Sequence, residues 1–239
     1  MANQYLLLWL EAPLQSWGHD SVFGRRDTLK FPTKSGVLGI ILSSMGASGP
    51  QQELLHKFSN LTQTIISFIP DGIGHPIKNY QPPNLLCDFQ VVGNGYNPNN
   101  LFESLFIPKT KKGSSATGGG SKLTYRNYLQ DSKFSAILEI PEDLSDDICG
   151  ALKDPAWDIY LGRKNCVPTD YVYKGIFNDE KSAIDFAMEI ALTKKLSERF
   201  MVIDGDSDIA SETFFINDIP TQFGEQKKYL DRQVSIIYA

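Results

Sequence analysis

The segment Phe-Pro-Thr-Lys-Ser-Gly-Val-Leu-Gly at residues 31–39 decides how the fold begins. Pro32 and Thr33 are typical of residues at the start of a helix, and apolar side chains follow them at helical spacing. These side chains are Val37, Leu38, Ile41, Leu42 and Met45. The pattern predicts a helix over residues 34–45, which follows a buried strand over residues 5–11.

The first turn of this helix combines groups that bind an anion. Its backbone N–H groups have no partner within the helix, Lys34 and Ser35 add an ammonium and a hydroxyl, and Gly36 lets a ligand approach closely. Phosphate is the anion that this combination favours. A second interpretation stays open, in which Thr33 or Ser35 only caps the helix and Lys34 is a solvated charge.

Length and composition are those of an ordinary globular protein. The chain has 239 residues, of which 41% are hydrophobic and 11% aromatic, so it can bury a large core. Its three cysteines, Cys87, Cys149 and Cys166, form no Cys-x-x-Cys pair, so we expect no zinc site, no disulfide framework and a cytoplasmic location. The first apolar run is short and ends at Glu11 and Pro13, which predicts a strand rather than a signal peptide or membrane span.

Further strand and helix patterns place the chain in the α+β class. Strands are predicted over residues 64–69, 133–140 and 157–161, and additional helices over residues 53–58 and 142–152. The main elements then follow the order β-α-β-β-α-β, which is the ferredoxin-like alternation. The last third predicts a mixed α/β extension packed on this core, with a helix over residues 181–194 and strands over 200–203, 213–216 and 233–238.

A long insertion separates the second and third strands of this core. Residues 85–125 begin with a strand-like segment at 87–92 and return through another at 123–125. Between these ends lie a Gly/Asn/Pro turn region, an apolar patch and a stretch rich in lysine, glycine and serine. A structureless loop of this length is unusual in a compact domain. We therefore expect a projecting hairpin over residues 85–125, and a palm made of residues 1–84 and 126–239.

The net charge of −5 argues against a nucleic-acid partner, but the distribution of charge does not. Between residues 105 and 134, six lysines and arginines accompany a single acid, Asp131. Between residues 139 and 158, seven acids accompany a single lysine, Lys153. This polarity predicts one face that binds RNA and another that faces solvent or protein.

Spacing excludes several catalytic and cofactor motifs. Lys34 and Ser35 lack the preceding glycines of a phosphate-binding loop, which argues against an NTPase. The aspartates at residues 204–208 alternate as in a calcium loop, but the turn glycine and the bidentate glutamate are missing, so we expect a solvated turn. No metal-ligand spacing is present, and we expect no cofactor. The histidines, which stand in no recognisable nucleophile context, are His19, His56 and His75.

Four clusters of residues carry phosphate or base chemistry. The loop at residues 15–17 offers an amide, a hydroxyl and an indole that either stacks on a base or packs in the core. The other clusters are cations near the first helix, on the insertion, and after the predicted strand at 157–161. The candidate RNA-binding residues are Gln15, Ser16, Trp17, Arg25, Arg26, Lys30, Lys34, Ser35, Lys109, Lys111, Lys112, Lys122, Arg126, Arg163 and Lys164. Together with interleaved aromatic residues they predict a track for single-stranded RNA.

Four segments, in a shared order, also carry a family resemblance. They are Tyr-Leu-Leu-Leu-Trp-Leu-Glu-Ala-Pro-Leu-Gln-Ser-Trp-Gly at 5–18, the segment quoted at 31–39, Leu-Thr-Tyr-Arg-Asn-Tyr-Leu at 123–129 and Tyr-Leu-Gly-Arg-Lys-Asn-Cys at 160–166. On these segments the chain resembles the CasD family of the RAMP superfamily. Members of this family hold the 5′ end of the guide RNA in the type I-E CRISPR surveillance complex (Cascade). The last third of the chain matches only loosely.

The resemblance implies a ferredoxin-like (RAMP) palm and a β-hairpin thumb in a subunit without catalytic activity. The palm would bind the repeat-derived 5′ handle of the crRNA, and the thumb would bend the RNA where handle meets spacer. The handle track would include Gln15, Trp17, Arg25, Arg26, Lys34, Ser35, Arg163 and Lys164. The implied partners are the CasC backbone filament, which the subunit would cap, the large subunit CasA and, indirectly, target DNA in antiviral defence.

An alternative function stays open beside this one. The related type I-C subunit is a metal-independent endoribonuclease that processes CRISPR repeat RNA. That reaction needs a general base for a 2′-hydroxyl and cations for the scissile phosphate. The candidates in this sequence are His19 or Tyr125 as the base and Lys122 as the cation.

Overall fold

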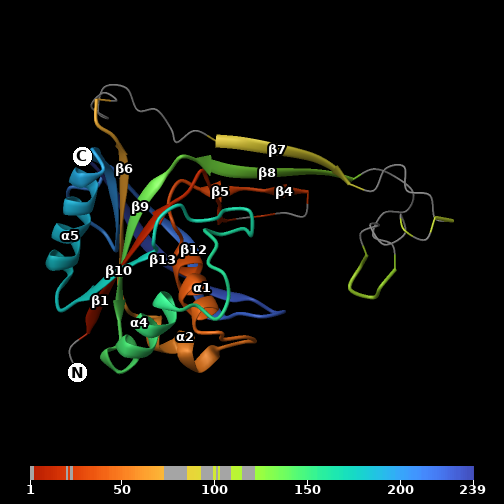
Figure 1. Cartoon of the computed structure of the whole chain (residues 1–239), viewed down its shortest axis with the longest axis horizontal. Coiled ribbons are helices and arrows are strands. Elements are labelled where there is room, and N and C mark those ends of the chain that lie inside the picture. Colours follow the sequence, from red (N-terminus) through yellow and green to blue (C-terminus); the bar gives the residue numbers. More distant parts are fainter. Residues whose placement is uncertain are drawn as a thin grey trace.

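A seven-stranded antiparallel sheet forms the centre of the molecule (Figure 1). The computed structural model describes residues 3–19, 21, 24–72, 85–92, 99–100, 102, 109–114 and 122–239. The strand order is β10-β1-β9-β6-β11-β13-β12. The strands are β1 (Gln4–Glu11), β6 (Gln63–Pro70), β9 (Lys133–Ile140), β10 (Tyr173–Phe177), β11 (Leu196–Asp204), β12 (Glu212–Gln222) and β13 (Lys228–Tyr238). The α+β class predicted from the sequence is confirmed.

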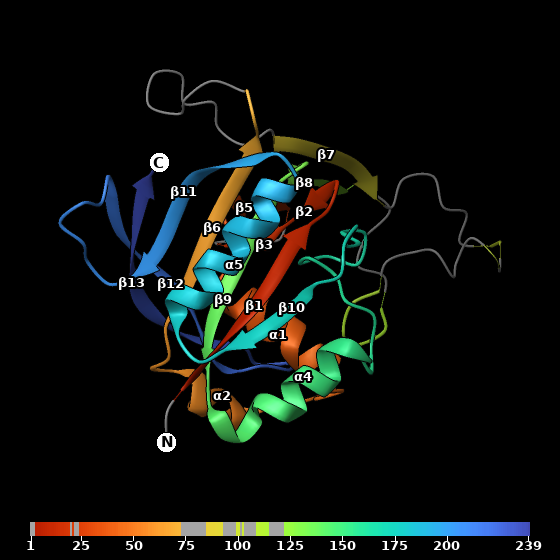
Figure 2. The same cartoon turned by 60° about the vertical axis from the view of Figure 1, so that its left-hand side comes forward.

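Helices cover both faces of this sheet (Figure 2). One face carries α1 (Lys34–Ser44), α2 (Gln52–Phe58) and α4 (Ser145–Lys153), the last preceded by the short 3₁₀ helix η1 (Glu142–Leu144). The other face carries α5 (Glu180–Thr193). The helices expected at 34–45, 53–58 and 181–194 are therefore confirmed. Among the described residues, no helix has the length and apolarity needed to cross a membrane.

The sequence of β1 explains why two layers of helices are needed. Successive side chains of a strand point to opposite faces. Leu6, Leu8 and Leu10 accordingly join the core under α1, while Leu7 and Trp9 join the core under α5. All five are fully buried, and each contributes about 1.5–3 kcal/mol relative to an exposed position.

The first six main elements form a compact unit within the sheet. In chain order they are β1, α1, β6, β9, α4 and β10, and their strands lie side by side as β10-β1-β9-β6. Each strand of this unit runs antiparallel to its neighbours. The C-terminal strands continue the same sheet beyond β6, since β11 pairs with β6 and β13 with β11.

One strand prediction for this unit is wrong. Residues 157–161 form no strand, and β10 at Tyr173–Phe177 pairs with β1 instead. The apolar alternation of the segment has another cause, because Ile159 packs against the core and Leu161 is fully buried within it. The backbone of Leu161 bonds to Cys166 and to Ser16 rather than to a strand of the large sheet. The alternation therefore marks a loop packed on the core.

A second, smaller sheet carries an arm that projects from the molecule (Figure 1). The arm consists of β7 (Leu85–Val92) and β8 (Lys122–Gln130), which pair in antiparallel register from Leu85↔Leu129 to Val92↔Lys122. The inner half of β8 also pairs with β2 (Leu14–Gln15) and, in parallel, with β4 (Arg25–Arg26). A further short pair joins β3 (Trp17–Gly18) to β5 (Thr28–Leu29). The strands expected at both ends of the insertion are confirmed. Its turn region at 93–98, most of its apolar patch and its glycine-rich stretch at 115–121 lie outside the described residues.

Candidate nucleic-acid interface

Three arginines from distant parts of the sequence meet at the base of the arm. Strands β4 and β8 pair in parallel with Arg26 opposite Arg126, so these two side chains share one face of the small sheet. Tyr128 follows two residues after Arg126 and faces the same side. The Arg163 guanidinium lies 4.5 Å above the Tyr128 ring, and its Nη2 donates to the Arg26 carbonyl at 3.1 Å. We call Arg26, Arg126 and Arg163 the arginine cluster.

The arginine cluster contains a buried donor without a partner and has one acid, Asp88, beside it, among the described residues. Asp88 stands opposite Arg126 on β7, and its carboxylate accepts a hydrogen bond from Gln90. Arg163 Nη1 is buried and has no hydrogen-bond partner in the part of the chain that the structure describes. A buried donor without a partner costs about 1–3 kcal/mol, which an anion at this position would offset. The cluster therefore has the charge and the free donor that a phosphate group requires.

A close backbone contact links the arginine cluster to the first loop of the chain. Gly162, next to Arg163, has a φ of +101°, and a Cβ at this position would lie 1.8 Å from the Ser16 carbonyl oxygen. Ser16 N–H in turn donates to the Leu161 carbonyl at 3.1 Å. Only glycine fits here. The loop that carries Arg163 is thereby held against the loop that precedes β3.

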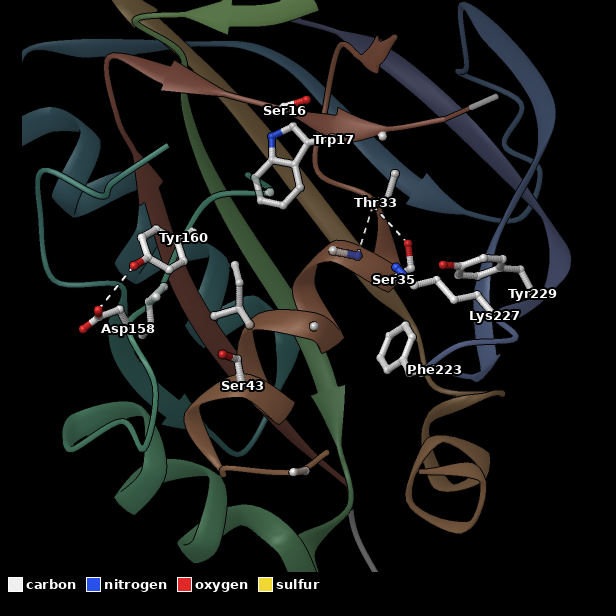
Figure 3. Close-up of a pocket in the computed structure, with 18 of the residues that line it drawn as sticks. Ser16, Trp17, Thr33, Ser35, Ser43, Asp158, Tyr160, Phe223, Lys227 and Tyr229 are labelled. Atoms are coloured by element: carbon white, nitrogen blue, oxygen red, sulfur yellow. Dashed lines mark hydrogen bonds between the residues drawn. The ribbon is translucent and has the colours of Figure 1, made fainter. Parts of the chain in front are cut away.

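A groove of about 540 Å³ begins at this contact and follows the outward face of α1 (Figure 3). Its floor is made mostly of small residues of α1, namely Ser35, Gly36, Gly39 and Ser43, and it also includes Ile40 and the buried ring of Trp17. Tyr160 and Asp158 lie on one side of α1, and residues of the β12–β13 hairpin lie on the other. The hairpin residues are Phe223, Gly224, Lys227 and Tyr229. Gly162, which precedes Arg163 in the chain, also lines the groove, so the groove extends to the loop that carries Arg163.

A family model described as "CRISPR-associated protein (Cas_Cas5)" matches residues 5–235. The chain belongs to the CRISPR-associated Cas5 family. The resemblance drawn from the four sequence segments is therefore confirmed. A curated relative, the CRISPR system Cascade subunit CasD of Escherichia coli (strain K12), is 26% identical over 176 residues, which cover 72% of this chain and 71% of the relative.

Two solved structures share the fold of this Cas5 protein. A chain of a "CRISPR RNA-guided surveillance complex" superposes with a TM-score of 0.69 at 23% identity, covering 98% of this chain and 90% of that one. A "Crystal structure of Cas protein" superposes with a TM-score of 0.58 at 21% identity, covering 98% of this chain and 94% of that one. The similarity to both extends over nearly the whole chain, so it includes the C-terminal strands.

Four predicted RNA-binding residues of this Cas5 protein are buried, and they are Gln15, Ser16, Trp17 and Lys34. Trp17 is 1% exposed, and its ring packs so closely on Gly36 that a Cβ there would lie 2.7 Å from it. Gln15 is fully buried; its amide donates to the Leu10 and Ser132 carbonyls and accepts from the Trp17 indole. Lys34 is 1% exposed, and its ammonium donates to the Leu61 carbonyl. This corrects the expectation for Gln15 and Lys34, whose polar groups are bonded inside the protein, whereas Trp17 and Ser16 line the groove although they are at most 3% exposed.

The start of α1 is likewise occupied by the protein itself. Thr33 Oγ1 accepts from Gly36 N–H at 3.1 Å, and Asp218 Oδ2 accepts from Lys34 N–H at 2.7 Å. Of the two interpretations of this turn, helix capping by Thr33 is confirmed. Lys34 is not the solvated charge that this interpretation assumed, since burial lowers the pKa of its ammonium. Ser35 is half-buried and lines the groove.

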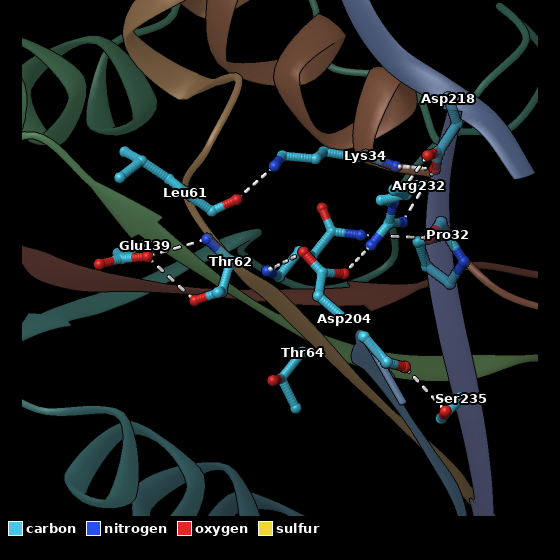
Figure 4. Close-up of polar contacts among 12 residues, drawn as sticks. Pro32, Lys34, Leu61, Thr62, Thr64, Glu139, Asp204, Asp218, Arg232 and Ser235 are labelled. Atoms are coloured by element: carbon cyan, nitrogen blue, oxygen red, sulfur yellow. Dashed lines mark hydrogen bonds and ion pairs between the residues drawn. The ribbon is translucent and has the colours of Figure 1, made fainter. Parts of the chain in front are cut away.

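A buried ion network holds the β12–β13 hairpin beside α1 (Figure 4). The Arg232 guanidinium bonds both oxygens of Asp218, at 2.7 and 2.9 Å, and also bonds Asp204. Burial raises the pKa of Asp204, although Arg232 and Lys34 favour its charged form. The prediction of a solvated acidic turn is therefore wrong for Asp204. Sequence patterns gave no signal for this network, because its members lie far apart in the chain.

The remaining predicted residues divide between the base and the outer end of the arm. Arg26 is an exposed member of the arginine cluster, and Arg25 and Lys164 are exposed next to its members in the chain. Ser16 is buried with its hydroxyl 3.4 Å from the Asn127 carbonyl. Lys30 is exposed just after β5. Lys109, Lys111 and Lys112 are exposed. They belong to the segment at residues 109–114, which Figure 1 shows beyond the outer end of β7 and β8. Lys122 begins β8, and its side chain lies outside the described residues.

Two further observations concern metal ligands and the aromatic residues of the groove. Within the described ranges, no group of three or more His, Cys, Asp or Glu residues is arranged to hold a metal ion. The aromatic residues of the groove, Phe223 and Tyr229, come from the last third of the chain, where the sequence analysis found no site. A glycine turn between aromatic residues at 223–229 was the available signal.

Proposed function

We propose that this Cas5 protein is a non-catalytic RNA-binding subunit of a Cascade-type surveillance complex and binds the 5′ handle of the crRNA. The observation that carries this proposal is the convergence of Arg26, Arg126 and Arg163 around Tyr128. Planar guanidinium groups bind phosphate through paired N–H donors. The relative in Escherichia coli is named as a Cascade subunit, which agrees with this assignment.

The proposal includes a palm and a thumb. The β1-α1-β6-β9-α4-β10 unit is the ferredoxin-like palm, and residues 85–125 form the thumb. The antiparallel order β10-β1-β9-β6, with α1 and α4 on one face, supports the palm assignment. The projection of β7 and β8 from the molecule supports the thumb assignment (Figure 1). The RNA handle runs from the base of the thumb along the palm.

The thumb also suits contact with protein neighbours. Its register places Phe89 opposite Tyr125 and Val91 opposite Leu123 on one face. These four side chains are each between 42% and 52% exposed. An exposed apolar patch of this kind marks a protein contact. In the proposed complex the subunit caps the CasC filament, lies beside the large subunit CasA and helps position the guide on target DNA.

Binding of handle RNA to charge-reversed variants tests the proposal. Phosphate contacts supply most of the affinity of a protein for single-stranded RNA, so Arg126→Glu lowers affinity at least tenfold. Lys181→Glu is the matched control, because Lys181 is an exposed cation on α5, on the opposite face of the large sheet. Fluorescence anisotropy at physiological salt measures both. Equal affinities for the wild type and Arg126→Glu would remove the arginine cluster from the interface.

Incubation with a full CRISPR repeat RNA tests the non-catalytic part of the proposal. Purified protein is mixed with the RNA in the presence of EDTA, and the products are separated by size. We expect intact RNA. Site-specific cleavage would instead assign the endoribonuclease function, and Tyr125→Phe would then show whether Tyr125 is the base.

A further inference from the structure

We propose that the groove along α1 receives one unstacked nucleobase of the bound RNA, next to the phosphate held by the arginine cluster. This inference rests on the proposed function, since it needs an RNA strand at the cluster. Four properties of the groove carry it: a floor made mostly of small side chains, aromatic walls, a low charge and a fixed shape.

The floor of the groove is open because α1 presents small residues on its outward face. Ser35, Gly39 and Ser43 recur every four residues, so they lie above one another on one side of the helix. A Cβ at Gly39 would meet nothing within 4 Å. Helices that face solvent normally carry charged or long polar side chains there, and glycine lowers helix stability. The cavity of about 540 Å³ is within the range of small-molecule sites.

The walls supply aromatic rings on both sides of this floor. Figure 3 shows Tyr160 on one side of α1, and Phe223 and Tyr229 on the other. All three side chains are half-buried. Splayed bases of single-stranded RNA stack on such rings. The Tyr160 hydroxyl donates to the Asp158 carboxylate at 3.3 Å, which sets the direction of its ring.

The charges of the groove favour a base over a phosphate group. Lys227 is the lining cation and Asp158 the lining carboxylate, so the groove offers no excess of positive charge. The neighbouring arginine cluster does offer that excess. Gly162 lines the groove and Arg163 follows it in the chain, so consecutive parts of one nucleotide strand can reach both. Phosphate and base are thereby assigned to different parts of one surface.

The hairpin wall of the groove is held in place before any ligand binds. Phe223 N–H donates to the Pro50 carbonyl at 2.9 Å, and a Cβ at Gly224 would lie 3.4 Å from the Gly49 backbone. The Arg232–Asp218 pair holds the other end of the same hairpin against the start of α1. A preformed site loses less entropy on binding than a mobile one.

Filling the groove tests this inference without weakening the fold. Gly39→Leu places a side chain in the open space, and it replaces glycine by a strong helix former, so the melting temperature stays equal or rises. We expect its affinity for handle RNA to fall about tenfold, which is within the range for loss of one stacked base. Gly150→Leu is the matched control, because Gly150 lies within α4, also has open space at its Cβ and does not line the groove.

Abasic RNAs then identify whether a base occupies the groove. Handle RNAs that each lack one base are bound to the wild type, to Gly39→Leu and to Tyr160→Ala. We expect one abasic position to weaken binding to the wild type about tenfold, and to have no further effect on either variant. Tyr171→Ala, which changes a tyrosine that is 87% exposed outside the groove, keeps the wild-type response.

The possible results separate this inference from the proposed function. If handle RNA binds the wild type tightly but Gly39→Leu binds equally well, the inference is wrong and the proposed function stands. The same holds if every abasic RNA binds like the intact one, or if the sensitive position stays sensitive in both variants. If the groove holds a side chain of a partner protein and no base, Gly39→Leu binds handle RNA as tightly as the wild type. If the wild type binds no handle RNA, the proposed function fails and the inference fails with it.

Discussion

Arg232 and Arg163 are two arginines of the same chain in opposite electrostatic situations. Arg232 is 6% exposed in its side chain, bonds both oxygens of Asp218 and also bonds Asp204, so its charge is neutralised within the protein. Arg163 lies over a tyrosine ring and shares its surface with Arg26 and Arg126, and one of its buried donors has no partner among the described residues. The difference assigns Arg232 a role in stabilising the fold, and it supports the proposed phosphate contact of Arg163.

The largest expected effect is on the stability of an Arg232→Met variant. Loss of the guanidinium leaves the buried Asp218 and the half-buried Asp204 without their shared cation, and breaking a buried pair in this way costs about 3–5 kcal/mol. Chemical denaturation measures the free energy of unfolding. The comparison predicts that a triple variant, Arg232→Met with Asp204→Asn and Asp218→Asn, recovers part of the loss. A variant Arg232→Met as stable as the wild type would mean that the network does not hold the hairpin.

The second effect concerns RNA binding by Arg163→Gln. We expect affinity for handle RNA to fall about tenfold and the slope of log K against log salt to decrease by about one phosphate contact. The free energy of unfolding should change by less than about 2 kcal/mol, since the lost interactions are one cation–π contact and one hydrogen bond to the Arg26 carbonyl. Anisotropy titrations at several salt concentrations give both quantities. A stability loss as large as that of Arg232→Met would erase the distinction between the two arginines.

Lys34 extends the comparison to a lysine that the sequence placed in the interface. Burial holds the pKa of its ammonium below the ordinary value of 10.5. In the window between the lowered pKa and 10.5, the unfolded chain binds more protons than the folded one, so stability rises with pH there. Lys34→Met removes this rise. We expect the affinity of Lys34→Met for handle RNA to stay within about twofold of the wild type, because Lys34 contacts no phosphate group. Denaturation between neutral and alkaline pH, with anisotropy at neutral pH, checks both statements.

The smallest effect is expected at the ion pair of Arg25 and Asp27. Their side chains are 66% and 43% exposed and 3.3 Å apart. Exposed pairs of this kind contribute about 0–1 kcal/mol, so Arg25→Gln leaves the free energy of unfolding nearly unchanged. Thermal denaturation at low and high salt measures it. A large loss of unfolding free energy that persists at high salt would show that Arg25 pairs with a buried group.

Regular elements of this protein were predictable because their causes are local. The helix over 34–45 follows from its cap and apolar spacing, and the strands over 64–69 and 133–140 follow from β-branched and alternating residues. The strand expected at 157–161 fails for a physical reason. Alternating burial of Ile159 and Leu161 arises equally in a loop packed on a core, and the sequence does not show where the backbone hydrogen bonds go.

The candidate site was predictable only in part. Arg26, Arg126 and Arg163 were recognised as cations near turns and aromatic residues, but so were Lys109 and Lys112, which lie beyond the outer end of the arm. Charge and spacing describe a residue type and its neighbours in the chain. They do not describe the register of β4 on β8, and this register is what places Arg26 beside Arg126.

By itself, the sequence determined the family, the mixture of helices and strands and the presence of an inserted hairpin. Those properties depend on the order of residues and on interactions over a few positions. The tertiary structure alone decided that Trp17 and Lys34 are internal, that Arg232 is neutralised by Asp218 and Asp204, and that α1 and the β12–β13 hairpin enclose a groove. Burial and ion pairing depend on which segments meet in the fold, and partners that are 14 to 184 positions apart leave no periodic signal.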